Sequence, residues 1–428
     1  DPMPEAWEIL TKYKKPQPEN RDVKITIDKN LQAFVAKQLG DRNGAVVILN
    51  PQTGDVLAAY SNPAYKLSDA ESLAGWMKLE ADKKNKPTLN RTLHEFYMPG
   101  STFKTFTMIS AFRAGKQNID LRPDPGSPCY VPFRGSREIC DGSGGCHSCQ
   151  GPIRDAFRAS SNQFFSRMAN ALGRERMGET ATAFGMAPVE TSEDALKQGR
   201  FADIWNVSSR RLASALAPAR SAITTGAGLN LYESAIIGMG QGGAGTVTPL
   251  QLALIAAAPA NMEGKMMKPR IEMDQPPQAF SQVLSPQQAR EVRDIMSTVT
   301  QEAGGTATRA LAKVLAAGIT TGGKTGTADK DVPKYDAQGK VVKRTVRKRN
   351  RETGEFYEEL QTVLWQRWDG LFLCIAPVEN PQIAMMVAIE NIGTGAYGGT
   401  TAAPIAANIL IEARRLGLLG APATPARR

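Results

Sequence analysis

The sequence predicts an α/β (α+β) fold: an antiparallel five-stranded sheet flanked by helices, with an inserted, mostly helical subdomain. Runs rich in β-forming residues lie near both ends of the chain, whereas the stretch of about 85–310 between them has mostly helical patterns. Strands that come from both chain ends favour one sheet with the helical region inserted between its halves. With 428 residues, 42% of them hydrophobic, the chain can bury a sizeable core.

The first predicted elements are a linker, a strand, a helix and a hairpin. Residues 1–21 are polar and proline-bearing, so we expect a linker or a remnant of an N-terminal region. A short strand is predicted at 23–27, followed by an amphipathic helix whose N-cap is Asp28. The sequence GAVVILNPQTGDVLAAYS (44–61) then contains two β-rich runs around a turn at 50–54, which predicts a hairpin.

Three further strands and a last helix are predicted near the C-terminus. The strands are AGITTGGKTGTA, which ends at Ala328, WDGLFLCIAP and QIAMMVAIEN, and the turn-like VENP joins the last two. The helix is AAPIAANILIEARRLG. These elements place the sheet subdomain at about 22–80 and 310–416, the helical subdomain at about 85–305, and a flexible tail at 417–428.

A charged insert separates two of these strands. Residues 329–363 carry basic side chains in their first half and acidic side chains in their second half, with a turn signal at 352–355. A protruding hairpin that pairs with itself is the predicted structure. We expect its surface to be solvated, and a contact with a membrane or a partner is the alternative.

The net charge of +10 suits an anionic partner, such as nucleic acid, phospholipid or an acidic polymer. No zinc-finger spacing, RNA-binding aromatic motif or concentrated basic helix is present, so nucleic acid is not the predicted partner. The longest apolar stretches, such as LALIAAAPA, fall well below the ~18 residues that cross a bilayer.

The stretch YMPGSTFKTF carries a candidate nucleophile and its base. Ser101 and Lys104 stand three residues apart, so a helix would place their side chains on one face. Serine attacks once a base takes its proton, and the free N–H groups of a first helical turn favour an oxyanion. The apolar residues after Lys104 would bury its amine, which then loses its charge readily. Alone, the pattern also fits an N-cap serine and an unrelated lysine.

Two further motifs support the enzymatic interpretation. ASSNQFF holds Ser160 and Asn162, which could relay a proton and orient an amide. GGKTGTA could hold a substrate carboxylate on a strand, because it offers an ammonium group, two hydroxyls and a glycine that lets a bound chain approach the backbone. Each motif alone also fits a helix cap or a glycine-rich strand end, whereas all three in this order favour a catalytic site. The residues of the last motif are Lys324, Thr325, Gly326 and Thr327.

These three motifs, in this order, are those of the penicillin-binding proteins, and the chain resembles their transpeptidase domain over about 22–416. The stretches NRTLHEFYMPGSTFK, GMGQGGAGTVTPLQLA and GGTTAAPIAANIL also fit. The second of these and KTGTA look more like the monofunctional class B members. That resemblance implies an active site between the sheet and the helical subdomain. It also implies an extracytoplasmic location, in the periplasm or on the outer face of the cytoplasmic membrane, with an N-terminal anchor absent from the present chain.

The resemblance implies a D,D-transpeptidase that cross-links peptidoglycan stem peptides. Ser101 would attack the carbonyl between the terminal D-alanines with Lys104 as base, and the N–H groups of Ser101 and Thr327 would form the oxyanion hole. Ser160 and Lys324 would return a proton to the leaving D-alanine, and an amine of a second stem peptide would resolve the acyl-enzyme. The implied catalytic residues are Ser101, Lys104, Ser160, Asn162 and Lys324, and the implied substrate-binding residues are Thr325, Gly326 and Thr327.

β-Lactam antibiotics would acylate Ser101 as substrate mimics, and a membrane glycan polymerase is the expected partner enzyme. No cofactor is expected. A D,D-carboxypeptidase, which uses water as acceptor, and a β-lactam sensor domain are the alternatives. A class A β-lactamase also needs the glutamate of an E-x-x-L-N pattern, which GAGLN (226–230) lacks, so lasting inhibition by penicillin is predicted.

Five cysteines complete the candidate residues. Cys374 lies in an apolar run and is expected in the core, whereas the other four lie between the first two motifs. Two disulfides are the first expectation for an extracytoplasmic domain, although four cysteines allow three pairings. A structural zinc site is the alternative, because C-x-x-C has ligand spacing, His147 is close, and some class B proteins are similar in having a metal-binding loop here. The clustered cysteines are Cys129, Cys140, Cys146 and Cys149.

Overall fold

The computed structural model describes residues 22–121, 128–142, 151–244, 246–336, 338–349 and 353–420. The predicted linker 1–21, the last eight residues of the predicted tail, Cys146 and Cys149 lie outside these ranges. Among the described residues, no helix combines the length and the apolar character that a membrane crossing requires.

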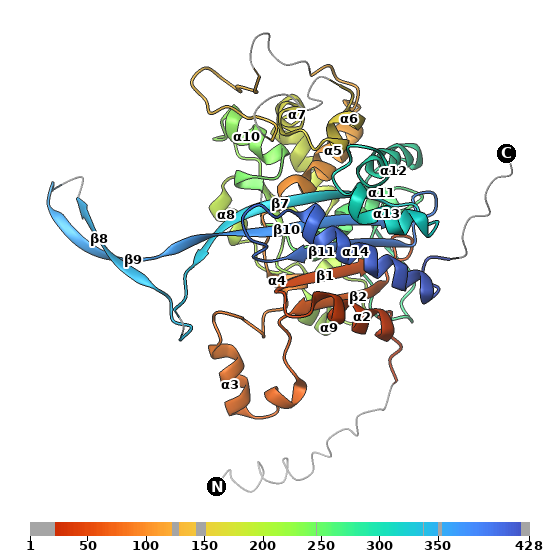
Figure 1. Ribbon diagram of the computed structural model, residues 1–428, viewed down its shortest axis with the longest axis horizontal. Coiled ribbons are helices and arrows are strands. Elements are labelled where there is room, and N and C mark those ends of the chain that lie inside the picture. Colours follow the sequence, from red (N-terminus) through yellow and green to blue (C-terminus); the bar gives the residue numbers. More distant parts are fainter. Residues whose placement is uncertain are drawn as a thin grey trace, which may run out of the picture.

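One antiparallel five-stranded sheet crosses the middle of the molecule, with the strand order β2-β1-β11-β10-β7 (Figure 1). The first two strands form the predicted hairpin, and β1 pairs on its other side with β11 from the far end of the chain. Strands β1 and β11 are buried along their whole lengths. The predicted fold class is confirmed. The strands are β1 (Gly44–Leu49), β2 (Val56–Asn62), β7 (Gly322–Pro333), β10 (Leu364–Ala376) and β11 (Ile383–Ile389).

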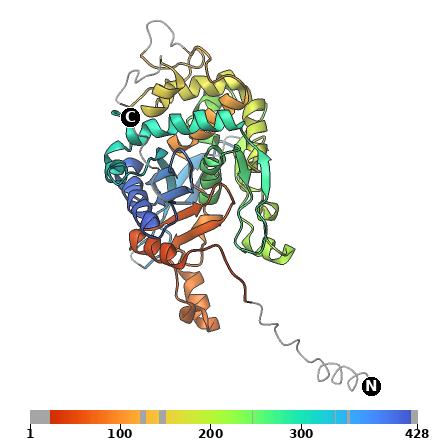
Figure 2. The ribbon, with the colours of Figure 1, turned by 90° about the vertical axis from the view of Figure 1, so that its right-hand side faces the viewer.

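Helices cover both faces of the sheet. Helices α2 (Lys29–Leu39) and α14 (Gly398–Arg415) lie together on one face, at the lower left of Figure 2. Asp28 caps α2 as predicted, because its carboxylate accepts from the backbone N–H groups of the first turn. On the other face lie α11 (Pro249–Ala260) and α12 (Pro286–Gln301). All residues of α11 are buried, as expected of a helix that is apolar all round.

The inserted helices pack beside β7, the outermost strand of the sheet (Figure 1). A 3-10 helix (Gly100–Phe103) leads into α5 (Lys104–Arg113), which packs against α7 (Asn162–Ala183). One hydrophobic cluster joins these helices to the sheet, so the proposed division into two subdomains stays a prediction. Leu419 is buried in that cluster, and the packed chain therefore reaches beyond the predicted limit at 416.

The remaining elements are short. The helices are α3 (Leu73–Ala81), α4 (Arg91–His94), α6 (Ile153–Arg158), α8 (Ser192–Leu196), α9 (Arg210–Leu216), α10 (Leu231–Gly238) and α13 (Thr308–Ala316). The short strands form two pairs: β3 (Ala187–Val189) with β4 (Ala222–Thr224), and β5 (Lys265–Met267) with β6 (Ala279–Gln282).

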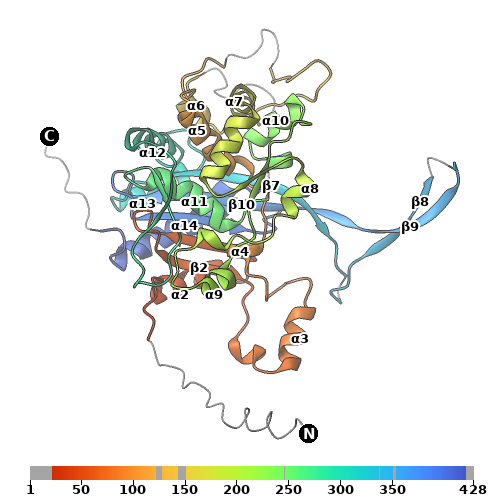
Figure 3. The same ribbon diagram turned by 180° about the vertical axis from the view of Figure 1, so that it is seen from behind.

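The charged insert forms the predicted self-paired hairpin. Its strands β8 (Lys343–Arg349) and β9 (Phe356–Thr362) project from the ends of β7 and β10, away from the rest of the molecule (Figures 1 and 3). The Arg347 guanidinium lies 4.5 Å from the centre of the Phe356 ring, and Lys348 pairs with Glu359 at 2.5 Å. Opposite charges on paired strands thus face each other, as the charge pattern predicts.

Two strand predictions need correction. Residues 23–27 form no strand, only a single bridge between Ile25 and Glu272. The Thr26 hydroxyl bonds the carbonyls of both Val56 and Arg270, and the chain turns into α2 directly afterwards. Strand β7 begins and ends later than the predicted 317–328, because its pairing with β10 starts at Gly322 and continues past Ala328 to Pro333.

Candidate active site

The turn that carries Ser101 lies directly against β7. Gly100 has a φ of +51°, a left-handed conformation that favours glycine. A Cβ atom on Gly100 would lie only 2.5 Å from the carbonyl oxygen of Thr327, and a Cβ atom on Gly326 would lie 2.7 Å from a side-chain carbon of Thr102. The absence of side chains at these two glycines therefore allows Ser101 and Thr327 to approach each other.

Lys104 is fully buried behind Ser101, at the start of α5. Its Nζ atom donates to the Ser160 carbonyl oxygen at 2.6 Å, to Ser160 Oγ at 3.2 Å and to Asn162 Oδ1 at 2.7 Å. Burial lowers the pKa of Lys104 to about 7, although the negative charge of Asp141 opposes this shift. A large fraction of the amine is therefore neutral near pH 7, which suits a general base.

Lys324 approaches the same hydroxyl from β7. Its buried Nζ atom donates to Ser160 Oγ at 2.8 Å and to the Thr325 carbonyl oxygen at 3.2 Å, and it lies 5.6 Å from the centre of the Phe157 ring. Burial, and secondly the positive charge of Lys104, lower the pKa of Lys324 well below its usual value. Ser160 therefore connects two buried amines that both bind a proton weakly.

Ser160 and Asn162 are positioned by the start of α7. Ser160 has a φ of +58°, which is uncommon for a residue with a side chain. Ser161 caps α7, and Asp141 accepts from the Ser161 hydroxyl at 2.8 Å and from the Gln163 N–H at 3.0 Å. The Asn162 side-chain amide donates to the Cys140 carbonyl at 3.2 Å. The cysteine loop thus supports the second motif directly.

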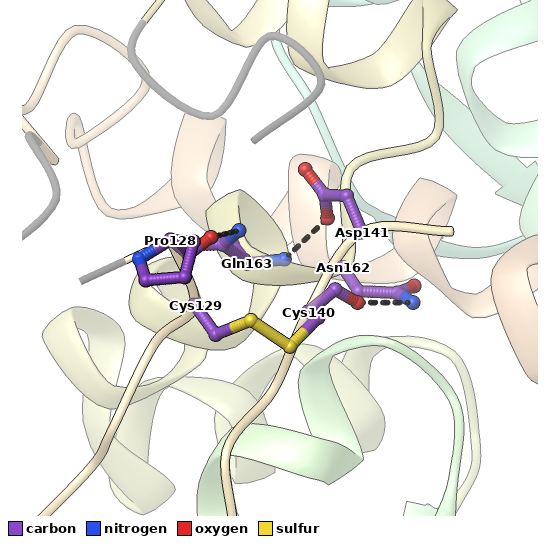
Figure 4. Close-up of a disulfide and its surroundings, with 6 residues drawn as sticks. All are labelled: Pro128, Cys129, Cys140, Asp141, Asn162 and Gln163. Carbon is purple, nitrogen blue, oxygen red and sulfur yellow. Dashed lines mark hydrogen bonds between the residues drawn. A yellow bond between two sulfur atoms is a disulfide. The ribbon is translucent and has the colours of Figure 1, made fainter. Parts of the chain in front are cut away.

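A disulfide joins Cys129 and Cys140 in this loop, with Cα atoms 4.6 Å apart (Figure 4). Figure 4 also shows the bonds of Asn162 to Cys140 and of Gln163 to Pro128, on either side of the bridge. The sulfurs lie within 4.8 Å of a carboxylate oxygen of Glu138, but their covalent bond leaves no thiolate for a zinc ion. One of the two expected disulfides is therefore present, and the other two cysteines lie outside the described residues. Cys374 is buried in the core, as predicted.

A cavity of about 400 Å³ collects parts of all three motifs. Thr306 and Tyr397, which the sequence did not single out, also line it, and the hydroxyls of Thr306 and Thr325 lie 2.6 Å apart. Both newly found residues lie in glycine-containing loops before helices, and only their position in space connects them to the motifs. No carboxylate lines the described part of this cavity. The lining residues are Ser101, Ser160, Thr306, Thr325, Gly326, Thr327 and Tyr397.

The predicted site residues of the three motifs thus come together at one place between β7 and the inserted helices. Lys104 and Lys324 meet at Ser160 behind the cavity, and Asn162 accepts from Lys104 there. Asp141 is a supporting residue that sequence reasoning missed. The catalytic and binding roles of these residues stay predictions.

Comparisons with known proteins agree with this geometry. The family model of the penicillin binding protein transpeptidase domain matches residues 44–411. The chain is 29% identical to peptidoglycan D,D-transpeptidase PbpA of Mycolicibacterium smegmatis, over 94% of this chain and 74% of that protein. It is 27% identical to peptidoglycan D,D-transpeptidase MrdA of Acinetobacter baumannii, over 89% of this chain but only 52% of that protein.

Solved structures support the same relationship. Penicillin-binding protein A from M. tuberculosis, in its penicillin G acyl-enzyme complex, is 26% identical to this chain and superposes with a TM-score of 0.64. The match covers 92% of this chain and 80% of that one. The penicillin-binding protein of Helicobacter pylori in complex with MreC has the same fold, with a TM-score of 0.64 at 20% identity over 93% of this chain and 64% of that one. The present chain therefore belongs to the penicillin-binding protein transpeptidase domain family.

Proposed function

We propose that this protein is a peptidoglycan D,D-transpeptidase of the class B type that forms an acyl-enzyme on Ser101. The observation that carries the proposal is the shared hydroxyl of Ser160, to which the buried amines of Lys104 and Lys324 both donate next to Ser101. Related proteins named as D,D-transpeptidases, and acyl-enzyme complexes of similar fold, support the assignment.

In the acylation step, the neutral amine of Lys104 takes the proton of the Ser101 hydroxyl. The Ser101 oxygen then bonds to the carbonyl carbon between the two terminal D-alanines of a stem peptide. The backbone N–H groups of Ser101 and Thr327 stabilise the negative oxygen of the tetrahedral intermediate. The close approach of the Ser101 turn to β7, which two glycines permit, supports this pairing of donors.

The C–N bond to the last D-alanine breaks when its nitrogen receives a proton. Lys104 and Lys324 both contact Ser160 Oγ, so the proton passes through this hydroxyl to the leaving amine. The amine of a second stem peptide then attacks the ester carbonyl and loses one proton to Lys104. The C–O bond to Ser101 breaks, and Lys104 returns the proton to the Ser101 oxygen. The products are a new amide cross-link and free D-alanine.

The terminal carboxylate of the stem peptide binds the hydroxyls of Thr325 and Thr327 beside Lys324. Thr306 orients the first hydroxyl at 2.6 Å, and the Gly398 N–H donates to the second at 3.3 Å. Asn162 holds the Lys104 amine in place from behind the cavity through its Oδ1 atom. Hydroxyl donors near a buried amine suit a carboxylate, because charge-assisted hydrogen bonds are the stronger ones.

The reaction as proposed needs no cofactor, because side chains of this chain supply the nucleophile, the base and the proton relay. We infer that residues 22–419 act as one extracytoplasmic catalytic unit, since Leu419 packs in its core, and that 1–21 belong to a connection toward a membrane anchor. A membrane glycan polymerase is the proposed partner, and nucleic acid is not. The chain spans between about half and three quarters of the length of the curated relatives compared above.

The test is labelling with a fluorescent penicillin, in which the chain is compared with Ser101→Ala. We expect a stable adduct on the unchanged chain and none on the variant, with an equal circular dichroism spectrum as the folding control. A labelled Ser101→Ala variant, or an adduct that turns over within minutes, would contradict the proposal. The slow turnover is expected because no carboxylate lines the described part of the Ser101 cavity.

Product analysis separates the proposed enzyme from its alternatives. With a stem peptide as donor and an amine acceptor, a transpeptidase yields the cross-linked amide, whereas a D,D-carboxypeptidase yields only the shortened peptide. A β-lactam sensor domain yields neither product although it is acylated. Mass spectrometry of the reaction mixture distinguishes the three outcomes.

A further inference from the structure

A second cavity, which we call the distal cavity, lies beside the far end of β7. Its volume of about 870 Å³ exceeds the 400 Å³ of the cavity that contains Ser101. Its walls come from residues within 84–95, from 330–335, from β10 near Trp365, and from 41–43 and 390–391. None of the residues of the three motifs lines it, so the distal cavity needs an explanation of its own.

Two chain segments lead from the distal cavity to the Ser101 cavity. The first is β7, on which Thr327 lines one cavity and Lys330 lines the other. Three strand residues span about 10 Å at ~3.3 Å per residue. The second is the segment before Ser101, to which Lys330 is joined through Glu95 at 3.1 Å and the Phe96 carbonyl at 2.9 Å.

The outer edge of β7 forms a direct route between the cavities. β7 is the last strand of the sheet, so its outer edge has no neighbouring sheet strand. An extended peptide can lie along such an edge. A peptide whose terminal carboxylate lies at Thr327 therefore reaches Lys330 after about three residues at ~3.3 Å each.

The distal cavity is positively charged, with seven basic and four acidic side chains in its walls. Its two buried or half-buried acids already have cationic partners. Glu390 pairs with Arg91 at 3.1 Å and with Arg367 at 3.2 Å, and Glu95 pairs with Lys330 at 3.1 Å. The remaining charges lie at the exposed rim and carry a positive excess, which attracts an anionic ligand.

The rim offers exposed lysines at two positions. Lys84 and Lys86 come from the segment before α4, and Lys334 comes from the end of β7. None of these three lysines forms an ion pair within the described ranges. Two exposed aspartates, Asp41 and Asp331, also line the rim. The lysine side chains are therefore available to carboxylates of a ligand.

Two aromatic side chains add an apolar wall. Tyr335 and Trp365 both line the distal cavity, and Trp365 is 39% exposed. Aromatic rings present flat apolar faces with a polar edge, and such rings commonly line ligand sites. Cations together with partly exposed aromatic rings suit a sugar ring that carries carboxylates.

The backbone of the distal cavity resembles the active site in one further respect. In the described part of the chain, three residues other than glycine have a positive φ: Ser160 at 58°, Lys86 at 49° and Asn391 at 53°. Ser160 lies at the centre of the active site, and the other two line the distal cavity. Such conformations are uncommon and concentrate at functional sites.

We propose that the distal cavity binds the sugar-bearing, carboxylate-bearing end of the cell-wall strand whose stem peptide is processed at Ser101. This inference rests on the proposed function. The peptide lies along β7 with its terminal carboxylate at Thr327, while the sugar packs against Trp365 and Tyr335, and the carboxylates nearest the sugar contact Lys86 and Lys334. The distal cavity thereby selects stems that are attached to glycan.

Calorimetric titration of the full chain tests this inference after penicillin has blocked Ser101. The probe is a disaccharide-peptide fragment of peptidoglycan without the terminal D-alanines, and the comparison ligand is the same peptide without the sugar. We expect the sugar-bearing probe to bind at least tenfold more tightly. The double variant Lys86→Glu, Lys334→Glu should weaken its binding at least tenfold, and Trp365→Ala should remove the preference for the sugar.

The matched control is Arg210→Glu, Arg211→Glu, which makes the same charge change on the exposed start of α9. Its binding should equal that of the unchanged chain, and all variants should react with penicillin at the same rate. Three results would overturn the role of the distal cavity. They are no binding of the sugar-bearing probe, binding of the sugar-free peptide as tight as that of the probe, and a loss of affinity in the control variant as large as that in the Lys86→Glu, Lys334→Glu variant. Failure of the chain to form the penicillin adduct would instead overturn the proposed function on which this inference rests.

Discussion

Lys104 and Lys324 donate to one hydroxyl, that of Ser160, at 3.2 and 2.8 Å. The two amines come from a helix and from the outermost strand of the sheet, 220 residues apart in the sequence. Both are fully buried, and burial is the largest cause of their lowered pKa values. A hydroxyl between two weakly basic amines can pass a proton from either amine to the other. Transpeptidation requires such proton transfer both when Ser101 is acylated and when the acyl group passes to the second stem peptide.

Acylation by penicillin should depend on pH through Lys104. Its pKa of about 7 means that the amine is protonated below this pH and cannot accept the Ser101 proton. We therefore expect the second-order rate constant to rise about tenfold per pH unit below 7 and to level off above it. Stopped-flow measurement with a chromogenic β-lactam between pH 5 and 9 checks this.

Lys104→Arg tests the same base, because an arginine stays protonated throughout this range. The rate should fall by about 10²–10⁴, the usual contribution of a general base. Lys37→Arg, an exposed change on α2, is the control. Retention of the pH profile in Lys104→Arg would show that another group titrates.

Asp141→Asn should shift this pH profile. The negative charge of Asp141 raises the pKa of Lys104 against the effect of burial, so its removal should move the midpoint to lower pH. The rate at the plateau should also fall several-fold, because Asp141 accepts from both Ser161 and Gln163 at the start of α7. Asp203→Asn, an exposed change, should leave both quantities unaltered. A profile that keeps its midpoint would contradict the electrostatic role of Asp141.

Gly326→Ala should strongly reduce the rate of penicillin acylation and only slightly reduce the melting temperature. The new Cβ would lie 2.7 Å from a side-chain carbon of Thr102 and 3.1 Å from the Pro99 carbonyl oxygen, so β7 and the Ser101 turn must separate. A separation near 1 Å can cost about 10²-fold in rate. The matched control is Gly228→Ala, where no atom lies within 4 Å of the new Cβ. Penicillin acylation rates and melting temperatures of both variants decide the outcome, and equal rates would refute the packing argument.

Loss of the Cys129–Cys140 disulfide should lower both stability and acylation. A bridge that closes a short loop stabilises a protein by about 2–4 kcal/mol. The Cys140 carbonyl accepts from the Asn162 amide, so a freed loop should also slow acylation several-fold. Urea unfolding and acylation rates of Cys129→Ser, Cys140→Ser check this, with Cys374→Ala as a cysteine change elsewhere. Stoichiometric zinc in the unchanged chain, by elemental analysis, that is lost in the double variant would instead favour the alternative metal site.

Local sequence patterns determined the sheet strands, the projecting hairpin and two of the helices of this protein, whereas the elements of 85–310 were not predicted one by one. The β-rich runs and turn residues of 44–61 predicted a hairpin, the charge blocks of 329–363 predicted a self-paired projection, and Asp28 predicted a helix start. Such features depend on neighbouring residues, whose contacts are fixed by strand and helix periodicity. The spacing of Ser101 and Lys104 is local in the same sense, and the three motifs identified the family.

Tertiary structure alone decided which distant residues meet. Residues 23–27 resemble a strand, yet they form a single bridge, because their contacts are divided between Val56 and the 270–273 segment before the chain turns into α2. Thr306, Tyr397 and Asp141 belong to no recognised motif. They join the site because the loop before α13, the loop before α14 and the disulfide loop, respectively, pack around β7 and α7. The pKa values of the two lysines follow from burial, which no four-residue pattern contains. Local propensity specifies elements, whereas burial and long-range contacts, which depend on the whole packed chain, specify the site.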